Sequence, residues 1–327
     1  MLELKVSAST VGAIGKAFNQ IQEMSRSGQI ETDTPVRIQL AKGNYPGVLS
    51  YNLANPLIIE GVAGTTPEEI TVSAENCEAF HKDTENRAVF VIGPGATEVT
   101  LRGFTIENTH IKTADDASLG NQAEALCFHN QTGNLLCQDM RFISRQDTVH
   151  VKGFSRFENC YITGDVDFIW GYCDTSVWQD CLIHTRQDNR PGIRSAYVVQ
   201  SRALNSRPGF VFIDCTFTAD KRPEGSRIWI GRSQGTGRAD SVDRWDSIAL
   251  IGCKIDENYD SEIWTDEDGK KAVYPEKGTK DSGWREYGTR RINADGNEIP
   301  DRTELRNCHG AFLAAAEAQS LRDEYAL

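Results

Sequence analysis

Short apolar runs recur along the chain at a nearly constant interval. Each run reads apolar, polar or small, cysteine, variable, apolar, and five of these runs contain Cys137, Cys160, Cys181, Cys215 and Cys253. The successive separations are 23, 21, 34 and 38 residues. A repeat of about 22 residues with short alternating apolar runs is typical of a stacked β-solenoid. The pattern therefore predicts an all-β fold in which the two longer intervals are coils that carry loop insertions.

The pattern before the repeat predicts strands. Val36–Leu40 alternates apolar and polar residues and leads into a glycine-rich turn at Gly43–Gly47. Leu57–Ile59 and Val89–Ile92 are continuous apolar runs followed by glycine, which indicates fully buried strands. We expect these strands to continue the solenoid towards the beginning of the chain.

Both ends of the chain predict helices. Residues 10–25 carry apolar side chains at helical spacing after a Ser9-Thr10 pair that can cap the helix, namely Val11, Ile14, Phe18 and Ile21. Such a helix would cover the open sheet edge of the solenoid. Residues 311–325 predict a closing helix, and the polar residues 256–302 predict a long excursion over the surface.

Composition is that of one soluble protein, and we expect residues 1–327 to form a single domain, because a solenoid grows along one axis without a size limit on its core. No run of 18 apolar residues is present, so no membrane span is expected. The net charge of −12 argues against nucleic acid and against a fully ionised polyanion as partners. It favours a neutral or esterified substrate, unless the charge only keeps the protein soluble.

The nine cysteines do not indicate a disulfide framework, because their number is odd and five of them share the repeat. We expect them to be reduced, small hydrophobic residues inside the coils. The six histidines have no metal-ligand spacing, so neither a metal nor a cofactor is expected. Met1–Ser7 lacks the apolar core of a signal peptide, which predicts a cytoplasmic protein or one whose signal has been removed.

Two aspartates carry the candidate chemistry. Asp147 and Asp167 are 20 residues apart, about one coil, and Gln122 precedes Gln146 by 24 residues. On neighbouring coils these residues would form a row of two amides and two carboxyls, about 4.8 Å apart from strand to strand. The row could support carboxylate attack, proton transfer and oxyanion stabilisation, or it could be a ladder that only satisfies its own hydrogen bonds. Strand alternation also predicts that Asp165 points outwards beside Asp167.

The chain resembles the pectin methylesterase family in four motifs that occur in the family's order. They are Gln122-Ala123-Glu124-Ala125-Leu126, Gln146-Asp147-Thr148, Gly164-Asp165-Val166-Asp167-Phe168-Ile169-Trp170-Gly171 and Ile230-Gly231-Arg232. Further landmarks extend the resemblance over most of the chain. It implies a right-handed parallel β-helix that hydrolyses methyl esters of galacturonan through an aspartyl acyl-enzyme. The implied partner is methyl-esterified homogalacturonan or its oligosaccharides, bound by a monomer.

The resemblance also implies residue roles. Asp167 matches the nucleophile, and Asp147 matches the general acid that later acts as a base. Gln122 and Gln146 match the oxyanion-stabilising residues. Arg232 matches the arginine bound to the nucleophile; it should lower the pKa of Asp167, and an ionised Asp167 should raise that of Asp147.

The substrate groove departs from the family pattern. Trp170 matches an aromatic position of the groove, and His150 stands where the family usually has an aromatic residue. Gln234 replaces a tryptophan that stacks on sugar, since Ser233-Gln234 follows the arginine in place of Pro-Trp. An ester of another carbohydrate and a catalytically weak carbohydrate-binding solenoid therefore stay open as alternatives. A glycan lyase or glycosidase stays open as well, because parallel β-helices commonly host these enzymes.

Overall fold

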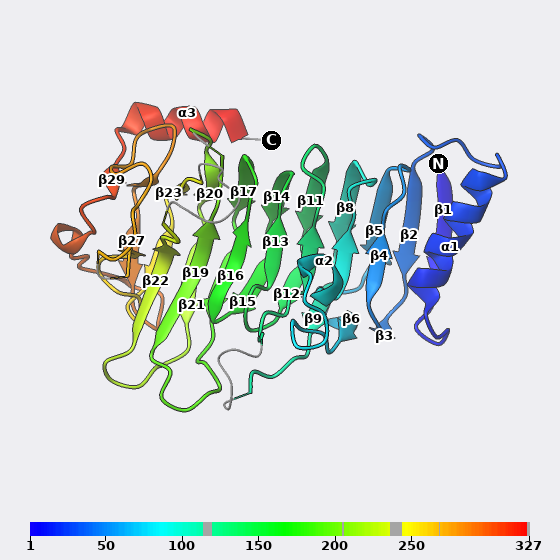
Figure 1. Cartoon of the computed structure of the whole chain (residues 1–327), viewed down its shortest axis with the longest axis horizontal. Coiled ribbons are helices and arrows are strands. Elements are labelled where there is room, and N and C mark those ends of the chain that lie inside the picture. Colours follow the sequence, from blue (N-terminus) through cyan, green and yellow to red (C-terminus); the bar gives the residue numbers. More distant parts are fainter. Residues whose placement is uncertain (114–119, 205, 236–243, 268, 326–327) are drawn as a thin grey trace. The chain divides into compact units, whose positions relative to one another are not determined.

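The computed structural model describes residues 1–113, 120–204, 206–235, 244–267 and 269–325. The chain divides into two compact units, Met1–Ile162 and Thr163–Leu327. In Figure 1 the first unit runs from blue to green and the second from green to red. Each unit is built from parallel strands that return once per coil to the same sheet.

The first unit contributes to three parallel sheets. One sheet contains β1 (Leu2–Val6), β2 (Val36–Leu40), β5 (Leu57–Gly61), β8 (Glu98–Arg102), β11 (Asn134–Gln138) and β14 (Phe154–Glu158). The second contains β4 (Leu49–Tyr51), β7 (Phe90–Ile92), β10 (Leu126–Phe128) and β13 (Val149–Val151). The third contains β3 (Gly43–Pro46), β6 (Ile70–Ala74), β9 (Thr105–Asn108) and β12 (Arg141–Ile143). β15 (Tyr161–Gly164) contains the boundary between the units.

Short connections also contain helical turns. In the first unit these are the 3-10 turn η1 (Pro67–Glu69) and the helix α2 (Thr84–Arg87), which precedes β7.

The core of the first unit is a ladder of inward side chains. Along one sheet the register aligns Ile38, Ile59, Leu101, Cys137 and Phe157, and all five are buried. Their neighbours in each strand point the other way, because successive residues of a strand alternate between its two faces. The apolar alternation of the sequence is thus the inward face of the coil, as predicted for Val36–Leu40.

The second unit repeats this arrangement. One sheet contains β17 (Thr175–Gln179), β20 (Gly209–Ile213), β23 (Ile248–Ile251), β26 (Trp284–Tyr287) and β29 (Ala311–Phe312). The next contains β16 (Val166–Gly171), β19 (Ser195–Ser201), β22 (Arg227–Arg232) and β25 (Trp264–Thr265). The third contains β18 (Leu182–Thr185), β21 (Thr216–Ala219), β24 (Lys254–Asp256), β27 (Arg290–Ile292) and the antiparallel β28 (Glu298–Ile299). A 3-10 turn, η2 (Thr303–Leu305), follows.

Six of the coils turn a corner between two sheets through one residue with a left-handed backbone. These residues are Gly103, Asp139 and Asn159 in the first unit and Asp180, Asp214 and Gly252 in the second, with φ between 50° and 70°. Glycine adopts this conformation without strain, and Asn and Asp tolerate it better than other residues. The polar or small residue in the sequence repeat is therefore the corner of the coil.

The residue after each corner points into the core. Cys160, Cys181, Cys215 and Cys253 hold this place and are buried. The expectation that Cys137 shares their register is wrong, because Met140 follows the corner of that coil. Cys137 lies three residues earlier, opposite Phe157, and is buried there. None of the nine cysteines, all in the described part of the chain, forms a disulfide.

Both predicted end helices form, but each begins later than expected. Helix α1 (Ala13–Arg26) lies beside β1, buries Ile14, Phe18 and Ile21, and starts after Gly12 instead of a Ser9-Thr10 cap. Val11 is outside the helix and is 82% exposed. Helix α3 (Ala315–Tyr325) packs Leu321 and Tyr325 on residues of β17, β20 and β23 (Figure 1). Each helix covers apolar side chains of its own unit.

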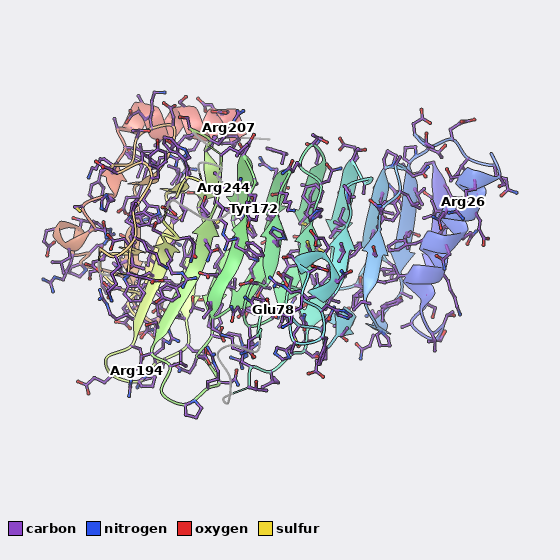
Figure 2. The ribbon with its side chains drawn as sticks, in the orientation of Figure 1. Arg26, Glu78, Tyr172, Arg194, Arg207 and Arg244 are labelled. Carbon is purple, nitrogen blue, oxygen red and sulfur yellow. The ribbon has the colours of Figure 1, made fainter. Side chains whose placement is uncertain are left out.

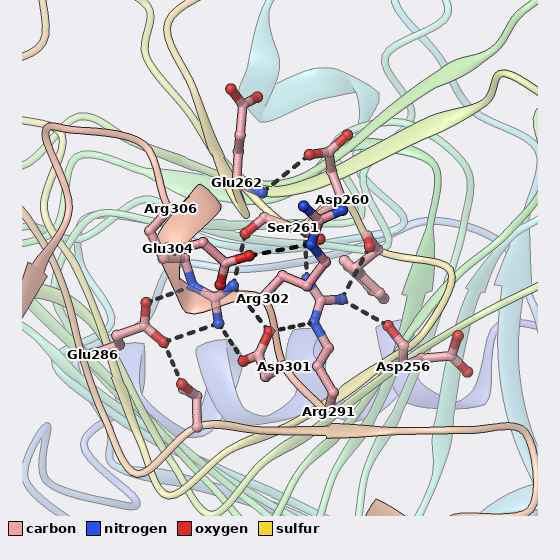
Figure 3. Close-up of polar contacts among 12 residues, drawn as sticks. Asp256, Asp260, Ser261, Glu262, Glu286, Arg291, Asp301, Arg302, Glu304 and Arg306 are labelled. Carbon is pink, nitrogen blue, oxygen red and sulfur yellow. Dashed lines mark hydrogen bonds and ion pairs between the residues drawn. The ribbon is translucent and has the colours of Figure 1, made fainter. Parts of the chain in front are cut away.

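Residues 256–302 are more than a surface excursion. They contain β26 and β27, and Trp284 is buried in a stack with Trp264 at 5.7 Å. Figure 3 shows why the polar composition misled: buried Arg291 and Arg306 both bind Asp301, and Arg306 also binds Glu286 at 2.8 Å. Burial of a charged side chain costs less free energy when the side chain pairs with an opposite charge and its hydrogen bonds are satisfied. The predicted fold class, a parallel β-helix with a helix at each end, is confirmed.

Candidate functional site

In the first unit, Asp147 lies on the connection from β12 to β13. Its backbone is left-handed, with φ 63°, and the residue is only 8% exposed. Asp tolerates this conformation better than most residues other than glycine. The conformation turns the Asp147 carboxylate towards Arg87, whose Nη2 lies 3.1 Å from Asp147 Oδ2.

The two glutamines of the predicted row lie side by side in the same unit. Gln122 and Gln146 form an isolated parallel bridge, and the backbone amide of Ala123 donates to the carbonyl of Gln146 at 3.1 Å. Both side chains are partly exposed. The spacing of 24 residues is therefore one coil, and Gln146 directly precedes Asp147 in the chain.

Arg87 holds a buried network around Asp147 that sequence reasoning missed. Its Nε donates to both carboxylate oxygens of Glu124 at 3.0 and 2.8 Å, and Nη2 donates to Oε1 at 2.8 Å. Glu78 lies 3.7 Å from Nη1. Glu124 is 0% exposed, and burial raises its pKa while the bonds from Arg87 oppose the rise. One arginine thus serves three carboxyl groups.

In the second unit, a β-bulge presents Asp167. β16 pairs Val166 with Tyr197 and Ile169 with Val199, so two residues of β16 face one residue of β19. Asp167 is one of the two, with φ 47° and 5% exposure. A bulge adds a residue and redirects the side chains around it. A regular strand would not give Asp167 this direction.

The bulge also corrects the expectation for Asp165. Val166 is partly exposed, whereas Asp165 is fully buried. Burial lowers the pKa of Arg222, and the charge of Asp165 is the first to oppose that effect. Asp165 is therefore a buried counter-charge to Arg222 and not a third carboxylate on an open face.

Asp167 is held through one oxygen. Gln200 Nε2 donates to Oδ2 at 2.6 Å, and Arg232 Nη2 donates to the same oxygen. The other oxygen, Oδ1, is buried and accepts no hydrogen bond from any residue that the structure describes. Anchoring one oxygen fixes the carboxylate plane while the second keeps its lone pairs for another partner.

The electrostatics of Asp167 differ from the sequence-based expectation. Burial raises its pKa, and Arg232, Arg202 and Lys271 act in the opposite direction without cancelling the effect. The arginine does favour the ionised form, as expected. Burial outweighs it because a carboxylate loses hydration when it is covered.

Arg232 is itself fixed on several sides. Its Nη1 contacts Glu267 Oε1 at 3.3 Å, and Lys271 Nζ lies 2.8 Å from the same oxygen. The guanidinium carbon is 4.5 Å from the ring centre of Tyr197, which stacks on Trp229 at 5.4 Å. Glu267 and Lys271 come from the segment that was expected to be a surface excursion.

Two aromatic residues shortly after Asp167 in the chain, Trp170 and Tyr172, form a rim with the side chains of two arginines. Arg202 lies over the ring of Trp170 at 5.0 Å and over that of Tyr172 at 5.3 Å. Arg244 lies 4.7 Å from the Tyr172 ring, and Figure 2 shows these two side chains next to each other. Trp170 is buried under this rim, so an arginine covers the aromatic face expected for a sugar.

Two other predicted groove residues have different surroundings. His150 is buried in β13, with Nδ1 3.3 Å from the sulfur of Cys127, so it packs between coils and presents no open face. Gln234 is partly exposed just after Arg232. Its neighbour Ser233 donates to Asp246 Oδ2 at 2.6 Å. Burial raises the pKa of Asp246 to about 7.

Within the described residues, no group of three or more His, Cys, Asp or Glu side chains could hold a metal ion. No described helix has the length and apolar character needed to cross a membrane. The missed residues gave weak signals. Gln200 lies in a strand one coil after Asp167, and Glu124 lies in the motif that begins at Gln122. Arg87 and Glu267 had no motif to mark them. The four motifs that contain Gln122, Asp147, Asp167 and Arg232 distinguish the candidate residues in the sequence.

The fold is similar to that of solved pectin methylesterases. The carrot enzyme matches with a TM-score of 0.69 and 18% identity over 96% of this chain and 88% of its own. The enzyme from Yersinia enterocolitica matches with 0.67 and 21% identity over 93% and 99%. At these identities the likeness concerns the fold, a right-handed parallel β-helix.

Curated relatives are more similar in sequence. Probable pectinesterase 50 of Arabidopsis thaliana is 26% identical over 220 residues, which are 67% of this chain and 56% of that protein. Pectinesterase A of Emericella nidulans is 27% identical over 173 residues, 52% and 48% of the two chains. The chain thus spans about half the length of these relatives.

These relatives overturn the expectation of a cytoplasmic protein. Pectinesterases of this kind are cell-wall or secreted enzymes. The prediction rested on the residues at the beginning of the sequence, which do not decide where a protein is located.

The family model described as Pectinesterase matches residues 8–274, which include the residues described around Asp147 and those described around Asp167. The chain therefore belongs to the pectinesterase family.

Proposed function

We propose that the protein hydrolyses methyl esters of galacturonan, polymeric or oligomeric, and releases methanol through a covalent intermediate on Asp167. The observation that carries the proposal is how the two oxygens of the Asp167 carboxylate are bound. Gln200 and Arg232 both bind Oδ2, and Oδ1 accepts no hydrogen bond from the described residues. A positioned carboxylate with one oxygen available is suited to nucleophilic attack.

In the proposed first step, Asp167 Oδ1 attacks the ester carbonyl carbon, and the carbonyl electrons move onto the carbonyl oxygen. Amide groups of Gln122 and Gln146 donate hydrogen bonds to that oxyanion. The carbonyl re-forms as the bond to the methoxy oxygen breaks, and protonated Asp147 gives its proton to the departing oxygen. The products are methanol and an anhydride between Asp167 and the uronate.

In the second step, water attacks the uronyl carbon of the anhydride. Asp147, now a carboxylate, accepts a proton from the water. The anhydride bond breaks towards Asp167, which regains its carboxylate and leaves a uronic acid. The same residue acts as acid in one step and as base in the next, so the enzyme returns to its starting protonation state.

The proposed substrate class has independent support. The net charge of −12 disfavours a fully ionised polyuronate and is compatible with an esterified one. A similar solved protein, a pectin methylesterase of 20% identity, is in complex with a hexasaccharide.

The test is methanol release from esterified pectin and from short methylated oligogalacturonides. Asp167→Asn should abolish it, because an amide keeps the shape but lacks the anionic oxygen. Asp180→Asn is the matched control, since Asp180 is exposed and has a similar backbone, with φ 52°. Asp167→Asn turnover within tenfold of the parent would show that Asp167 is not the nucleophile.

The same reactions separate the alternatives. A lyase would form unsaturated ends and a glycosidase would form new reducing ends, both without methanol. A binding solenoid would retain pectin without turnover.

A further inference from the structure

We propose that Arg87, fixed by Glu124, is a positioning residue that holds Asp147 in its carboxylate form. Arg87 thereby sets the alkaline limit of the pH range in which the protein hydrolyses the ester. The inference rests on the proposed function, in which Asp147 must be protonated for the first step and ionised for the second. It goes beyond that function by assigning a role to two residues outside the predicted site.

Glu124 holds the guanidinium group of Arg87 in contact with Asp147. Two guanidinium nitrogens bind both oxygens of Glu124 at 2.8 to 3.0 Å, and one of the two also reaches Asp147 Oδ2 at 3.1 Å. A bidentate arginine–carboxylate pair is directional and strong. Because Glu124 fixes the plane of the guanidinium, Arg87 cannot turn away from Asp147 without breaking three hydrogen bonds.

Burial strengthens the effect. Arg87, Glu124 and Asp147 are all less than a tenth exposed. Water therefore screens their charges little, and a cation in contact favours the ionised form of a carboxyl group. Glu78, 3.7 Å from Nη1, is the remaining acid around Arg87 that the structure describes. Figure 2 labels its position.

The two chemical steps respond in opposite ways. A carboxylate at Asp147 is ready to accept a proton from water, so breakdown of the intermediate is favoured. Formation of the intermediate needs the protonated carboxyl, which Arg87 makes less populated. We therefore expect the first step to limit the rate at neutral pH, and the covalent intermediate not to accumulate.

Two variants should move the alkaline limb of the pH profile in opposite directions. Arg87→Met combined with Glu124→Gln removes the cation together with its main partner, so Glu124 is not left as an unpaired buried charge. It should move the alkaline limb of kcat/KM to higher pH by about one pH unit or more, the usual effect of a close opposite charge. Glu124→Gln alone keeps an acceptor for Arg87 but removes a competing negative charge. It should move the limb to lower pH.

Glu85→Gln is the matched control. Glu85 is on the same helix as Arg87, yet it pairs with His129, at 2.8 Å, and with Lys152, at 3.9 Å. It should leave the limb in place, and Arg87→Lys should restore part of the parental profile. A role in folding alone would lower kcat without moving the limb. An unmoved limb, or a shift of both test variants in one direction, overturns the proposal.

A second measurement does not depend on turnover. The carboxyl carbon of Asp147 can be followed by NMR in protein labelled with ¹³C-aspartate, with Asp147→Asn to assign the signal. We expect its titration at lower pH in the parent than in the double variant. If the parent releases no methanol, the proposed function fails, but this titration still tests the inference. Equal titration in both proteins overturns it.

Discussion

Asp147 and Asp167 share one local arrangement, although each belongs to a different unit of the fold. Both have a left-handed backbone, and each accepts a hydrogen bond at Oδ2 from Nη2 of an arginine. Each arginine is bound in turn by a glutamate, Arg87 by Glu124 and Arg232 by Glu267. The pairs differ in burial, since Glu124 is enclosed and Glu267 is partly exposed.

Because of this difference, the pKa of Asp167 should be easier to change by surface substitutions than the pKa of Asp147. Glu267 and Lys271 can be changed without leaving a buried charge unpaired, whereas removal of Arg87 alone would leave Glu124 as an unpaired buried charge. Removing one member of a buried ion pair typically costs about 3–5 kcal/mol.

The first prediction concerns Lys271. This lysine lowers the pKa of Asp167, which burial raises overall. Lys271→Met should therefore raise that pKa further, and the nucleophile will need a higher pH to ionise. The acid limb of the kcat/KM profile should move to higher pH, by less than one unit because the lysine is partly exposed. Lys270→Met is the control, because Lys270 is exposed. A shift to lower pH, or an equal shift in the control, would contradict the assignment.

The second prediction concerns Asp246 and stability. Its pKa is raised from 3.8 to about 7 by burial, so the folded protein keeps a proton that the unfolded chain has already lost. The free energy of unfolding should therefore fall as pH rises from about 4 to 7, by at most about 4 kcal/mol from three pKa units. Asp246→Asn should remove this slope while keeping an acceptor for Ser233. Denaturant unfolding between pH 4.5 and 8 measures it.

The exposed Asp180→Asn variant serves as the reference for that series. It should reproduce the parental slope. If Asp246→Asn also unfolds with the parental pH dependence, the buried carboxyl does not hold the proton.

The third prediction concerns the groove. Gln234 is partly exposed next to Arg232, in the place of a family tryptophan. An aromatic face there should add about 1 kcal/mol of contact with a sugar. Gln234→Trp should lower KM for polymeric pectin by a few-fold with little change in kcat, because the side chain does not touch the ester. Three-sugar substrates should respond less. A fall in kcat at constant KM would place Gln234 at the reacting centre.

The fourth prediction concerns the cysteines. Eight of the nine are buried, and Cys308 is exposed. Burial also raises the thiol pKa of Cys127, Cys173 and Cys215, which makes them poor nucleophiles. A thiol reagent should therefore label Cys308 alone in the native protein and all nine after denaturation. Rapid labelling of Cys160 or Cys181 without denaturant would show that the coils open locally.

The sequence by itself determined the repeating part of this protein. The apolar period predicted the coils, β2 was predicted with its observed bounds, and the spacing of Gln122 and Gln146 predicted their bridge. These features are local or recur once per coil, so a pattern of side chains is enough to reveal them. The single-domain organisation, the monomeric state and the pairing of Asp147 with Asp167 stay predictions.

Only the tertiary structure decided the surroundings of Asp147 and of Asp167. Arg87 reaches Asp147 across 60 residues, and Arg232 reaches Glu267 across 35, from segments without a motif. Strand alternation placed Asp165 beside Asp167, but a bulge changed the direction of the strand at that point. Cys137 was assigned to the wrong register because two inward positions per coil accept the same small apolar side chain. Side-chain pattern specifies which face of a strand is buried, whereas the partner of a charged group depends on where the folded chain brings another charge.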